Sequence, residues 1–437
     1  MRLTKSLSSS LLASAVVALS LPVMAADTAP ASAPASAAAP AKIRIVACDA
    51  VVQSHKRGLC ANQMSADDFK AIAPGVSWYY TWNFEPTETS KVPDGVNVEF
   101  VPMVWGNGPE QLEGFKNYMK TGAKPRAVMV LNEPNLKGQA FITPEETATA
   151  YKKVKAVADE YKLPVVGPNM SLGSAKPDSI TAMDPIDKKQ TTYTFMVPFL
   201  KAFMYYMGDT PMPAFGWHTY GEMGEFRWAV GTMEKEFDQK QWVTEYAFWK
   251  AGNEESETRY LIEATDLLEK SDSVGAYAWF KERVTENKKL SILDKESGKL
   301  TPMGQIYVTM PVHDKDLYYQ MPGKLDAARY VKAEDMNVIP SKEKDASLEM
   351  RAQSGACDLS YNINVTDAGD YTIDIHAEKA GEIMVLDAAK KELATVQTKN
   401  GWQNVTATVK LPAGPQTLRL HFDTQGMGVT SLTFKKK

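Results

Sequence analysis

Between residues 43 and 310, one sequence unit recurs eight times. Each unit has a short run of β-branched, apolar and aromatic residues that ends in polar or aromatic side chains, and a helix-like amphipathic stretch usually follows. The eight runs cover residues 43–51, 75–84, 98–106, 127–135, 163–170, 214–220, 241–249 and 273–280. Eight strands that alternate with helices predict an α/β fold of the (β/α)8, or TIM-barrel, type over residues 43–315.

The helical stretches between these runs differ in length. Residues 143–161 give the clearest helix, because Thr143 and the Glu146 three residues later have the spacing of a capping box. The first three units are short, so we expect some of their helices to be reduced or missing.

The pattern changes at about residue 319, where helical periodicity stops. Short alternating runs cover residues 359–365, 369–377, 381–387, 392–398, 404–411, 416–422 and 429–434, with turn residues such as Pro412-Ala413-Gly414 between them. Short strands at this spacing predict a second, all-β domain, a sandwich over residues 319–437. The domain boundary should fall between residues 310 and 323.

The N-terminus has the organisation of a secretory signal. Arg2 and Lys5 precede an apolar run at 11–21, and Ala25 ends a group of small residues. Residues 1–25 therefore predict a signal peptide, and the Ala-, Pro- and Ser-rich residues 26–42 predict a linker. A retained membrane anchor is the alternative. No other apolar run reaches the length of a membrane span, so we expect a secreted or periplasmic protein.

Composition narrows the choice of partners. The 437 residues include 49 Lys or Arg and 53 Asp or Glu, a net charge of −4. This balance argues against nucleic-acid binding through a general basic field. We expect neither a nucleic acid nor a membrane as partner, and we expect a monomer. Of the three cysteines, Cys48 and Cys60 are close enough in sequence to form a disulfide, which would leave Cys357 free. The alternative is a buried structural cysteine at each position.

Two carboxylates stand at predicted strand ends. Glu133 lies near the end of the fourth run and Glu245 lies in the seventh. The carboxyl ends of barrel strands line the active site, so both side chains should enter one mouth. Paired carboxylates suit glycoside hydrolysis, in which one acid protonates the leaving oxygen and the other carboxylate attacks the anomeric carbon or activates water. A solvated surface charge is the alternative for each residue alone.

Neighbouring polar residues fit this chemistry. Asn132 can donate a hydrogen bond to a sugar 2-hydroxyl, a contact that strengthens in the transition state. His218 and Tyr220, at the sixth strand end, can hold Glu245 ionised and oriented. The alternative for His218 is a hydrogen-bonded histidine of the core.

The strand ends are also rich in aromatic rings, which stack on the apolar faces of sugars. Because side chains alternate along a strand, only about half of these rings should face the cleft. We expect the cleft to contain Trp105, Tyr220, Trp279 and Trp82.

These motifs together resemble the catalytic domain of glycoside hydrolase family 128. The resemblance covers about residues 43–310 through Lys56-Arg57-Gly58, VSWYYTWNF, VEFVPMVWG, LNEPN with GQAFITPEETA, VVGPN, WHTY and WVTEYAFW, in that order. It implies a secreted endo-β-1,3-glucanase with a retaining mechanism that needs no cofactor. Glu133 would be the general acid/base and Glu245 the nucleophile, with β-glucan as the partner. Val130-Leu131 replaces the Gly-Phe that often precedes Asn-Glu-Pro in the family.

The C-terminal part resembles carbohydrate-binding modules of family 6, which are jelly-roll sandwiches. The resemblance rests on Ala333-Glu334-Asp335, AGDYTIDIHA, NGWQNVTATVKLPAGPQTLRLHF and VTSLTF. It implies sugar binding by Trp402 and a structural calcium ion held in part by Glu334. The alternative for Glu334 is an exposed surface charge. The usual Asn-Leu-Asp-Trp near the end is replaced by Gly426-Met427-Gly428-Val429, so the alternative for Trp402 is a structural role.

Two other functions stay open. A barrel that only binds glycans would not need two carboxylates in one mouth, which argues against a non-catalytic receptor. The sequence distinguishes a hydrolase of another β-glucan or of an exopolysaccharide less well from an endo-β-1,3-glucanase, because the choice of linkage depends on the shape of the cleft.

Overall fold

The computed structural model describes residues 43–437. The predicted signal peptide (1–25) and linker (26–42) lie outside the described residues. Within residues 43–437, no helix combines the length and the apolar character that crossing a membrane requires.

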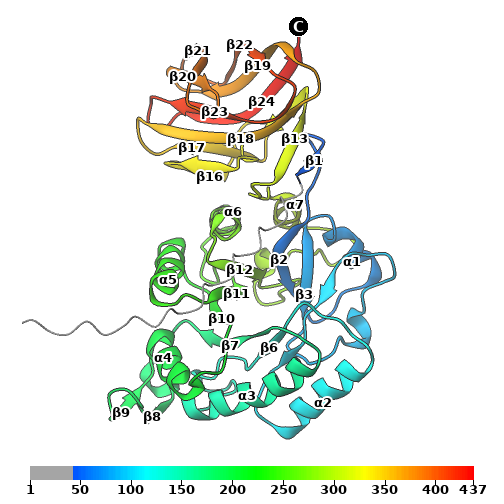
Figure 1. Cartoon of the computed structure of the whole chain (residues 1–437), viewed down its shortest axis with the longest axis vertical. Coiled ribbons are helices and arrows are strands. Elements are labelled where there is room, and N and C mark those ends of the chain that lie inside the picture. The colour runs from blue at the N-terminus through cyan, green and yellow to red at the C-terminus, as the bar shows by residue number, and fades with distance from the viewer. Residues whose placement is uncertain (1–42) are drawn as a thin grey trace, which may run out of the picture. The chain divides into compact units, whose positions relative to one another are not determined.

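A nine-stranded parallel sheet forms the first part of the fold, and we call it the barrel sheet (Figure 1). Its strands in spatial order are β4, β3, β2, β12, β11, β10, β7, β6 and β5. Their bounds are β2 (Ser54–Cys60), β3 (Val76–Tyr80), β4 (Glu99–Phe100), β5 (Met103–Val104), β6 (Val128–Val130), β7 (Val165–Ser171), β10 (Ala214–Thr219), β11 (Lys240–Tyr246) and β12 (Val274–Trp279).

The two edges of this sheet are adjacent in the chain. Only Val101 and Pro102 separate β4, which pairs with β3, from β5, which pairs with β6. Val101 N–H donates to Tyr79 O at 2.9 Å, and Met129 N–H donates to Pro102 O at 2.8 Å. One stretch of chain therefore contacts both edges, and the sheet curls into a core that resembles a TIM barrel.

The first predicted barrel strand, residues 43–51, is wrong. Strand β1 (Arg44–Val46) pairs in parallel with β13 (Leu317–Met321) in the C-terminal part. Along the chain, β2 is therefore the first strand of the barrel sheet. The sequence pattern does not predict β2, because this strand begins with the polar residues SHKR, whereas buried parallel strands are usually apolar throughout. The other seven predicted runs each overlap strands of the barrel sheet.

Helices follow most of the strands. They are α1 (Ala66–Ile72), α2 (Pro109–Lys120), α3 (Pro144–Glu160), α4 (Met196–Met207), α5 (Met223–Glu236), α6 (Glu254–Lys270) and α7 (Pro302–Thr309). The predicted capping box of α3 is confirmed, with Thr143 as N-cap and Glu146 as its partner. The first units are reduced, as expected: between β3 and β4 the chain forms only the 3-10 turn η1 (Glu88–Ser90).

Smaller elements complete this part. A two-stranded hairpin joins β8 (Thr181–Met183) to β9 (Gln190–Thr192) before α4, and the 3-10 turns η2 (Lys176–Asp178) and η3 (Lys288–Leu290) lie in loops.

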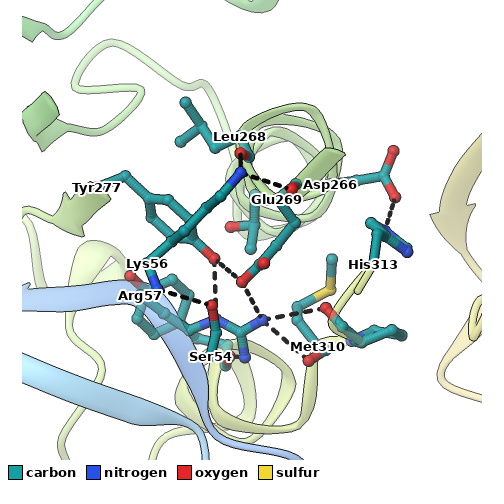
Figure 2. A network of polar contacts seen from close by, with 12 residues as sticks. Ser54, Lys56, Arg57, Asp266, Leu268, Glu269, Tyr277, Met310 and His313 are labelled. Atoms are coloured by element: carbon teal, nitrogen blue, oxygen red, sulfur yellow. Dashed lines mark hydrogen bonds and ion pairs between the residues drawn. The ribbon is translucent and has the colours of Figure 1, made fainter. Parts of the chain in front are cut away.

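A fully buried arginine joins the barrel sheet to its helices (Figure 2). From β2, Arg57 donates to Glu269 Oε1 of α6 at 3.0 Å, to the hydroxyl of Tyr277 on β12 at 3.0 Å and to Tyr307 O at the end of α7 at 2.8 Å. Met310 O accepts a further bond at 3.0 Å. Arg57 thus donates hydrogen bonds to carbonyls at the C-terminus of α7, where the last turn of a helix leaves carbonyl groups without partners. We call these residues and carbonyls the Arg57 cluster.

The C-terminal part consists of two sheets, one of which also contains β1 (Figure 1). We call these two sheets, β1 included, the β region. One has the order β1-β13-β18-β23-β20-β21, with β15 beside β18, and the other the order β16-β17-β24-β19-β22, with β14 beside β24. The further bounds are β14 (Gly323–Asp326), β15 (Lys332–Glu334), β16 (Met336–Pro340), β17 (Leu348–Ala352), β18 (Cys357–Val365), β19 (Gly369–Glu378), β20 (Gly381–Leu386), β21 (Glu392–Thr398), β22 (Gln403–Leu411), β23 (Gly414–Phe422) and β24 (Gly428–Lys436).

The core of the β region follows strand alternation. Along β19, Tyr371, Ile373 and Ile375 are buried, and the residues between them are partly exposed. All seven strands predicted after residue 359 are present, and the five strands before them were not predicted. The jelly-roll topology stays a prediction.

Two contacts of Asp266 connect the β region to the barrel part. Asp266 on α6 accepts a hydrogen bond from Tyr330 OH at 2.6 Å and lies 2.9 Å from His313 Nε2. From residue 43 onward, the chain therefore first joins a sheet of the β region, then builds the barrel sheet, and returns to the same β-region sheet at β13.

The cysteines are all free and buried, so the predicted disulfide between Cys48 and Cys60 is wrong and the structural alternative holds. The Cys48 thiol donates to Gln320 O at 2.9 Å, and the Cys60 thiol donates to Thr244 O at 3.2 Å. Burial raises the pKa of Cys48 to about 11 and that of Cys60 well above its ordinary value, so both thiols stay protonated.

Candidate active site

Two buried carboxylates meet at the carboxyl end of the barrel sheet. Glu133 follows β6 and is 7% exposed, and Glu245 near the end of β11 is 5% exposed. His218 on β10 is 1% exposed and lies opposite Glu245 in the strand register. Burial of two carboxylates close together is costly without compensating contacts, so this arrangement points to chemistry rather than to stability.

His218 lies between the two carboxylates. Its Nδ1 atom is 3.0 Å from Glu133 Oε1 and 3.5 Å from Glu245 Oε1. The two carboxylate oxygens are therefore separated by no more than the sum of these distances, 6.5 Å. His218 Nδ1 thus hydrogen-bonds Glu133 and lies within ion-pair distance of Glu245, and a charged imidazolium would compensate part of the negative charge of both acids.

Three neutral donors hold Glu245 in place. Oε1 accepts hydrogen bonds from Tyr80 OH at 3.0 Å and from Trp82 Nε1 at 2.7 Å, and Oε2 accepts one from Tyr220 OH. Burial raises the pKa of Tyr80 and of Tyr220 well above the ordinary value, so both keep their hydroxyl protons. These donors fix the orientation of the Glu245 carboxylate.

The backbone at Glu133 is held in an unusual conformation. Leu131 and Glu133 have φ angles of 61° and 45°, in the left-handed region. Glu133 N–H donates to Asn169 O at 2.7 Å, while the Asn169 side chain donates to Val130 O at 3.1 Å and Leu131 O at 3.2 Å. Asn169 on β7 therefore fixes the turn that aims Glu133, and such strain is typical of functional sites.

Two opposing influences act on His218. Burial lowers its pKa, but the charge of Glu245 and the hydrogen bond and charge of Glu133 outweigh burial and raise the pKa above its ordinary value. Its second ring nitrogen, Nε2, is buried and has no hydrogen-bond partner among the described residues. His218 therefore carries a free polar atom inside the site.

Asn132 is brought to the same place. Its Nδ2 donates to Gln139 Oε1 at 3.0 Å, and its buried Oδ1 has no partner among residues 43–437. The amide group predicted to bind a sugar hydroxyl is thus already paired on one side and free on the other.

The predicted aromatic residues separate into three groups. Tyr220 and Trp82 contact Glu245 directly. Trp105 is partly buried beside Asn132, whose N–H donates to Trp105 O at 2.9 Å. The prediction that Trp279 faces the cleft is wrong: it is 0% exposed, packs against Tyr246 and donates to Leu290 O at 2.8 Å. Side-chain alternation on β12 turns this ring toward the helices.

Trp402 lies in the β region, just before β22. Its ring stacks on His376 with centroids 5.3 Å apart and an interplanar angle of 10°. It forms no part of the mouth around Glu133 and Glu245.

A cavity of about 690 Å³ opens beside Glu133. Glu133, His218 and Tyr220 line it together with Phe195 and Trp228, an exposed ring on α5. Positions at strand ends do not predict Phe195 or Trp228, because Phe195 is the N-cap of α4 and Trp228 lies on α5.

The sequence pattern also does not predict Tyr80 and Asn169 as site residues. Tyr80 belongs to VSWYY, in which every residue of β3 is buried, so alternation cannot show which ring faces the mouth. Asn169 ends VVGPN, and a polar residue at a strand end was the available signal.

No group of three or more metal-ligating side chains occurs among residues 43–437. The calcium ion expected near Glu334 does not fit its surroundings. The Glu334 carboxylate lies 2.5 Å from Lys332 Nζ and 3.3 Å from Arg419 Nη2, and Asp358 is itself paired with Arg419. Cationic side chains thus occupy the positions that calcium would need.

The comparisons with known proteins concern the barrel part. Residues 58–307 match the glycosyl hydrolase catalytic core family. Among solved structures, a family 128 (subgroup II) endo-β-1,3-glucanase from Sorangium cellulosum has 29% sequence identity and a TM-score of 0.52, over 59% of this chain and 100% of that one. The corresponding enzyme from Pseudomonas viridiflava has 28% identity and a TM-score of 0.52, over 60% and 100%. No curated protein matches the chain.

Proposed function

Because this chain belongs to the glycosyl hydrolase catalytic core family, we propose that it is a retaining endo-glycosidase that hydrolyses β-1,3-glucan. The observation that carries this proposal is the pair of buried carboxylates that share one imidazole. Inverting enzymes leave room for a water between carboxyl groups about 6.5–9.5 Å apart, whereas retaining enzymes hold them about 5–5.5 Å apart. The upper limit of 6.5 Å between the Glu133 and Glu245 oxygens supports retention.

In the proposed first step, Glu133 donates a proton to the glycosidic oxygen while Glu245 attacks the anomeric carbon. The C1–O bond to the leaving sugar breaks, and an ester to Glu245 forms. In the second step Glu133 takes a proton from water, whose oxygen bonds to C1 as the ester breaks. Both steps use protein side chains, so we propose that turnover needs no metal and is insensitive to chelators.

The surrounding donors act before and after the attack. Tyr80, Trp82 and Tyr220 hold Glu245 ionised for attack, and they stabilise the carboxylate again when it leaves the ester. His218 keeps the two carboxyl groups at a fixed separation. Asn132, with a free Oδ1, is placed to bind a sugar hydroxyl.

The substrate class rests on the likeness to the Sorangium and Pseudomonas endo-β-1,3-glucanases. The test is a chromatographic product assay on β-1,3-, β-1,4- and mixed-linked glucans, combined with NMR of the first anomer released. We expect cleavage of internal β-1,3 bonds with retained configuration, and none by the Glu245→Gln variant. An inverted first product contradicts the double displacement, and cleavage of only another linkage contradicts the substrate.

We further propose that the protein acts as an exported monomer and that Trp402 helps it bind insoluble glucan. The stacked pair of Trp402 and His376 supports this role, because His376 fixes the tryptophan ring in one orientation.

A further inference from the structure

The large cavity lies on one side of the catalytic pair. Glu133 and His218 line it, whereas Glu245 does not. Its volume of about 690 Å³ is in the range of about 300–1,000 Å³ that binding pockets have. In the proposed reaction the acid faces the oxygen of the leaving sugar, and the nucleophile faces the anomeric carbon. The side that is lined by Glu133 and not by Glu245 is therefore the side toward which the leaving part of the substrate extends.

Two aromatic rings form one wall of this cavity. Phe195 and Trp228 have centroids 5.3 Å apart and an interplanar angle of 31°. Phe195 is the N-cap of α4 and is fixed by a bridge to Gly173, whereas Trp228 on α5 is 54% exposed. A fixed ring thus supports an exposed one, which makes a rigid apolar platform of the kind on which the C–H faces of sugar rings stack.

Polar groups complete the cavity. Glu222 and Glu225 at the start of α5 and Lys250 after β11 line it and offer partners for sugar hydroxyls. Thr219 holds Glu225 through a hydrogen bond of 3.0 Å. His218 also lines the cavity, and its buried Nε2 has no partner among the described residues. A ligand with one apolar face and several hydroxyls satisfies both kinds of surface.

We propose that the platform of Phe195 and Trp228 binds the sugar unit on the leaving side of the cleaved bond, and that Trp228 is its main stacking residue. This inference rests on the proposed function, since it uses the assignment of Glu133 as the acid. It assigns to Phe195 and Trp228 the recognition of the leaving sugar, for which the proposed function names no residue.

The test compares two substrates that differ only on the leaving side. One is a β-1,3-glucan oligosaccharide, and the other is a β-1,3-linked glucobiosyl fluoride, which has no sugar there. We expect Trp228→Ala to lower kcat/KM about tenfold on the oligosaccharide, the loss of one aromatic contact, and to leave the fluoride unchanged. Trp228→Phe should retain most of the activity on the oligosaccharide.

Tyr205→Ala is the matched control. Tyr205 is an exposed ring on α4 that does not line the cavity, so its removal should change neither substrate. Thermal unfolding of all variants checks the fold. The contrast between the two substrates is a readout that a structural defect does not produce, because a disturbed site loses activity on both.

Equal losses on both substrates, or no loss on the oligosaccharide, overturn the platform. The wild-type enzyme tests the proposed function separately. If it hydrolyses neither β-1,3 substrate, the proposed function fails whatever the variants do.

Discussion

The catalytic mouth and the Arg57 cluster both bury charged side chains, but they differ in how completely these groups are paired. In the Arg57 cluster, each guanidinium nitrogen donates to an oxygen of Tyr277, Glu269 or the end of α7. In the mouth, His218 Nε2 and Asn132 Oδ1 are buried without a partner among residues 43–437. Complete pairing stabilises a fold, whereas buried polar atoms that lack partners beside the two carboxylates are typical of a functional site.

The largest effect that tests this contrast is the loss of a catalytic carboxylate. We expect Glu133→Gln and Glu245→Gln each to lower turnover on natural glucan on the order of a thousandfold or more, because the two groups act as one unit. Thermal unfolding should show that both variants remain folded. Near wild-type turnover in either variant contradicts the role of that residue.

Removal of Glu269 should have the opposite profile. Glu269→Ala leaves the buried Arg57 charge without its carboxylate, and breaking such a pair costs about 3–5 kcal/mol of the free energy of unfolding. Urea titration measures this loss, and turnover at a temperature where the variant is folded should be close to wild type. Asp67→Ala removes an exposed ion pair with Lys70 and should change stability by no more than about 0.5 kcal/mol. A stable Glu269→Ala variant would show that the cluster is not structural.

Tyr80→Phe sharpens the comparison within the barrel sheet. It removes one hydrogen bond to the Glu245 carboxylate, and a bond to a charged group is worth about 1.5–3 kcal/mol. We expect kcat to fall about tenfold or more, with a smaller change in KM. Tyr79→Phe is the matched control, because Tyr79 faces the other side of β3 and donates to Ser90 O. Equal kinetics of the two variants would exclude a role for Tyr80.

The pH dependence of stability tests His218. Its pKa is raised in the folded protein above the ordinary value of 6.5, so protonation favours the folded state. This stabilisation is complete below about pH 6.5 and is lost as the pH rises through the raised value. The stability difference between wild type and His218→Gln should therefore shift in favour of wild type as the pH is lowered from 8.5 to 6. An unchanged or opposite trend in urea titrations contradicts the assignment.

The smallest expected effect concerns the β region. In the full chain, Trp402→Ala should lower binding to insoluble β-1,3-glucan a few-fold and leave hydrolysis of short soluble oligosaccharides unchanged, because a binding module raises only local concentration. A pull-down measures the first effect. Unchanged binding favours a structural role for Trp402.

A cut between residues 310 and 323 is a poor test of the β region. Strand β1, at the other end of the chain, pairs with β13, and Asp266 binds both His313 and Tyr330. Removal of the β region therefore exposes an unpaired strand and a buried carboxylate in the barrel part. Point substitutions keep these contacts.

The sequence by itself determined what depends on neighbours along the chain. The alternation of strand and helix, the capping box at Thr143 and the positions of Glu133 and Glu245 at strand ends could all be predicted, because they are set by local periodicity and spacing. The seven predicted strands after residue 359 share this origin, since one face of each is buried and the pattern is visible.

Only the tertiary structure decided which surfaces those elements face. In strands buried on both sides, such as β3, nothing in the pattern tells an inward ring from an outward one, so Tyr80 was missed and Trp279 was misplaced. Strand β1 could join either sheet, and pairing with β13 across some 270 residues decided it. Trp228 entered the cavity only through helix packing, because contacts distant in sequence leave no local periodicity to read.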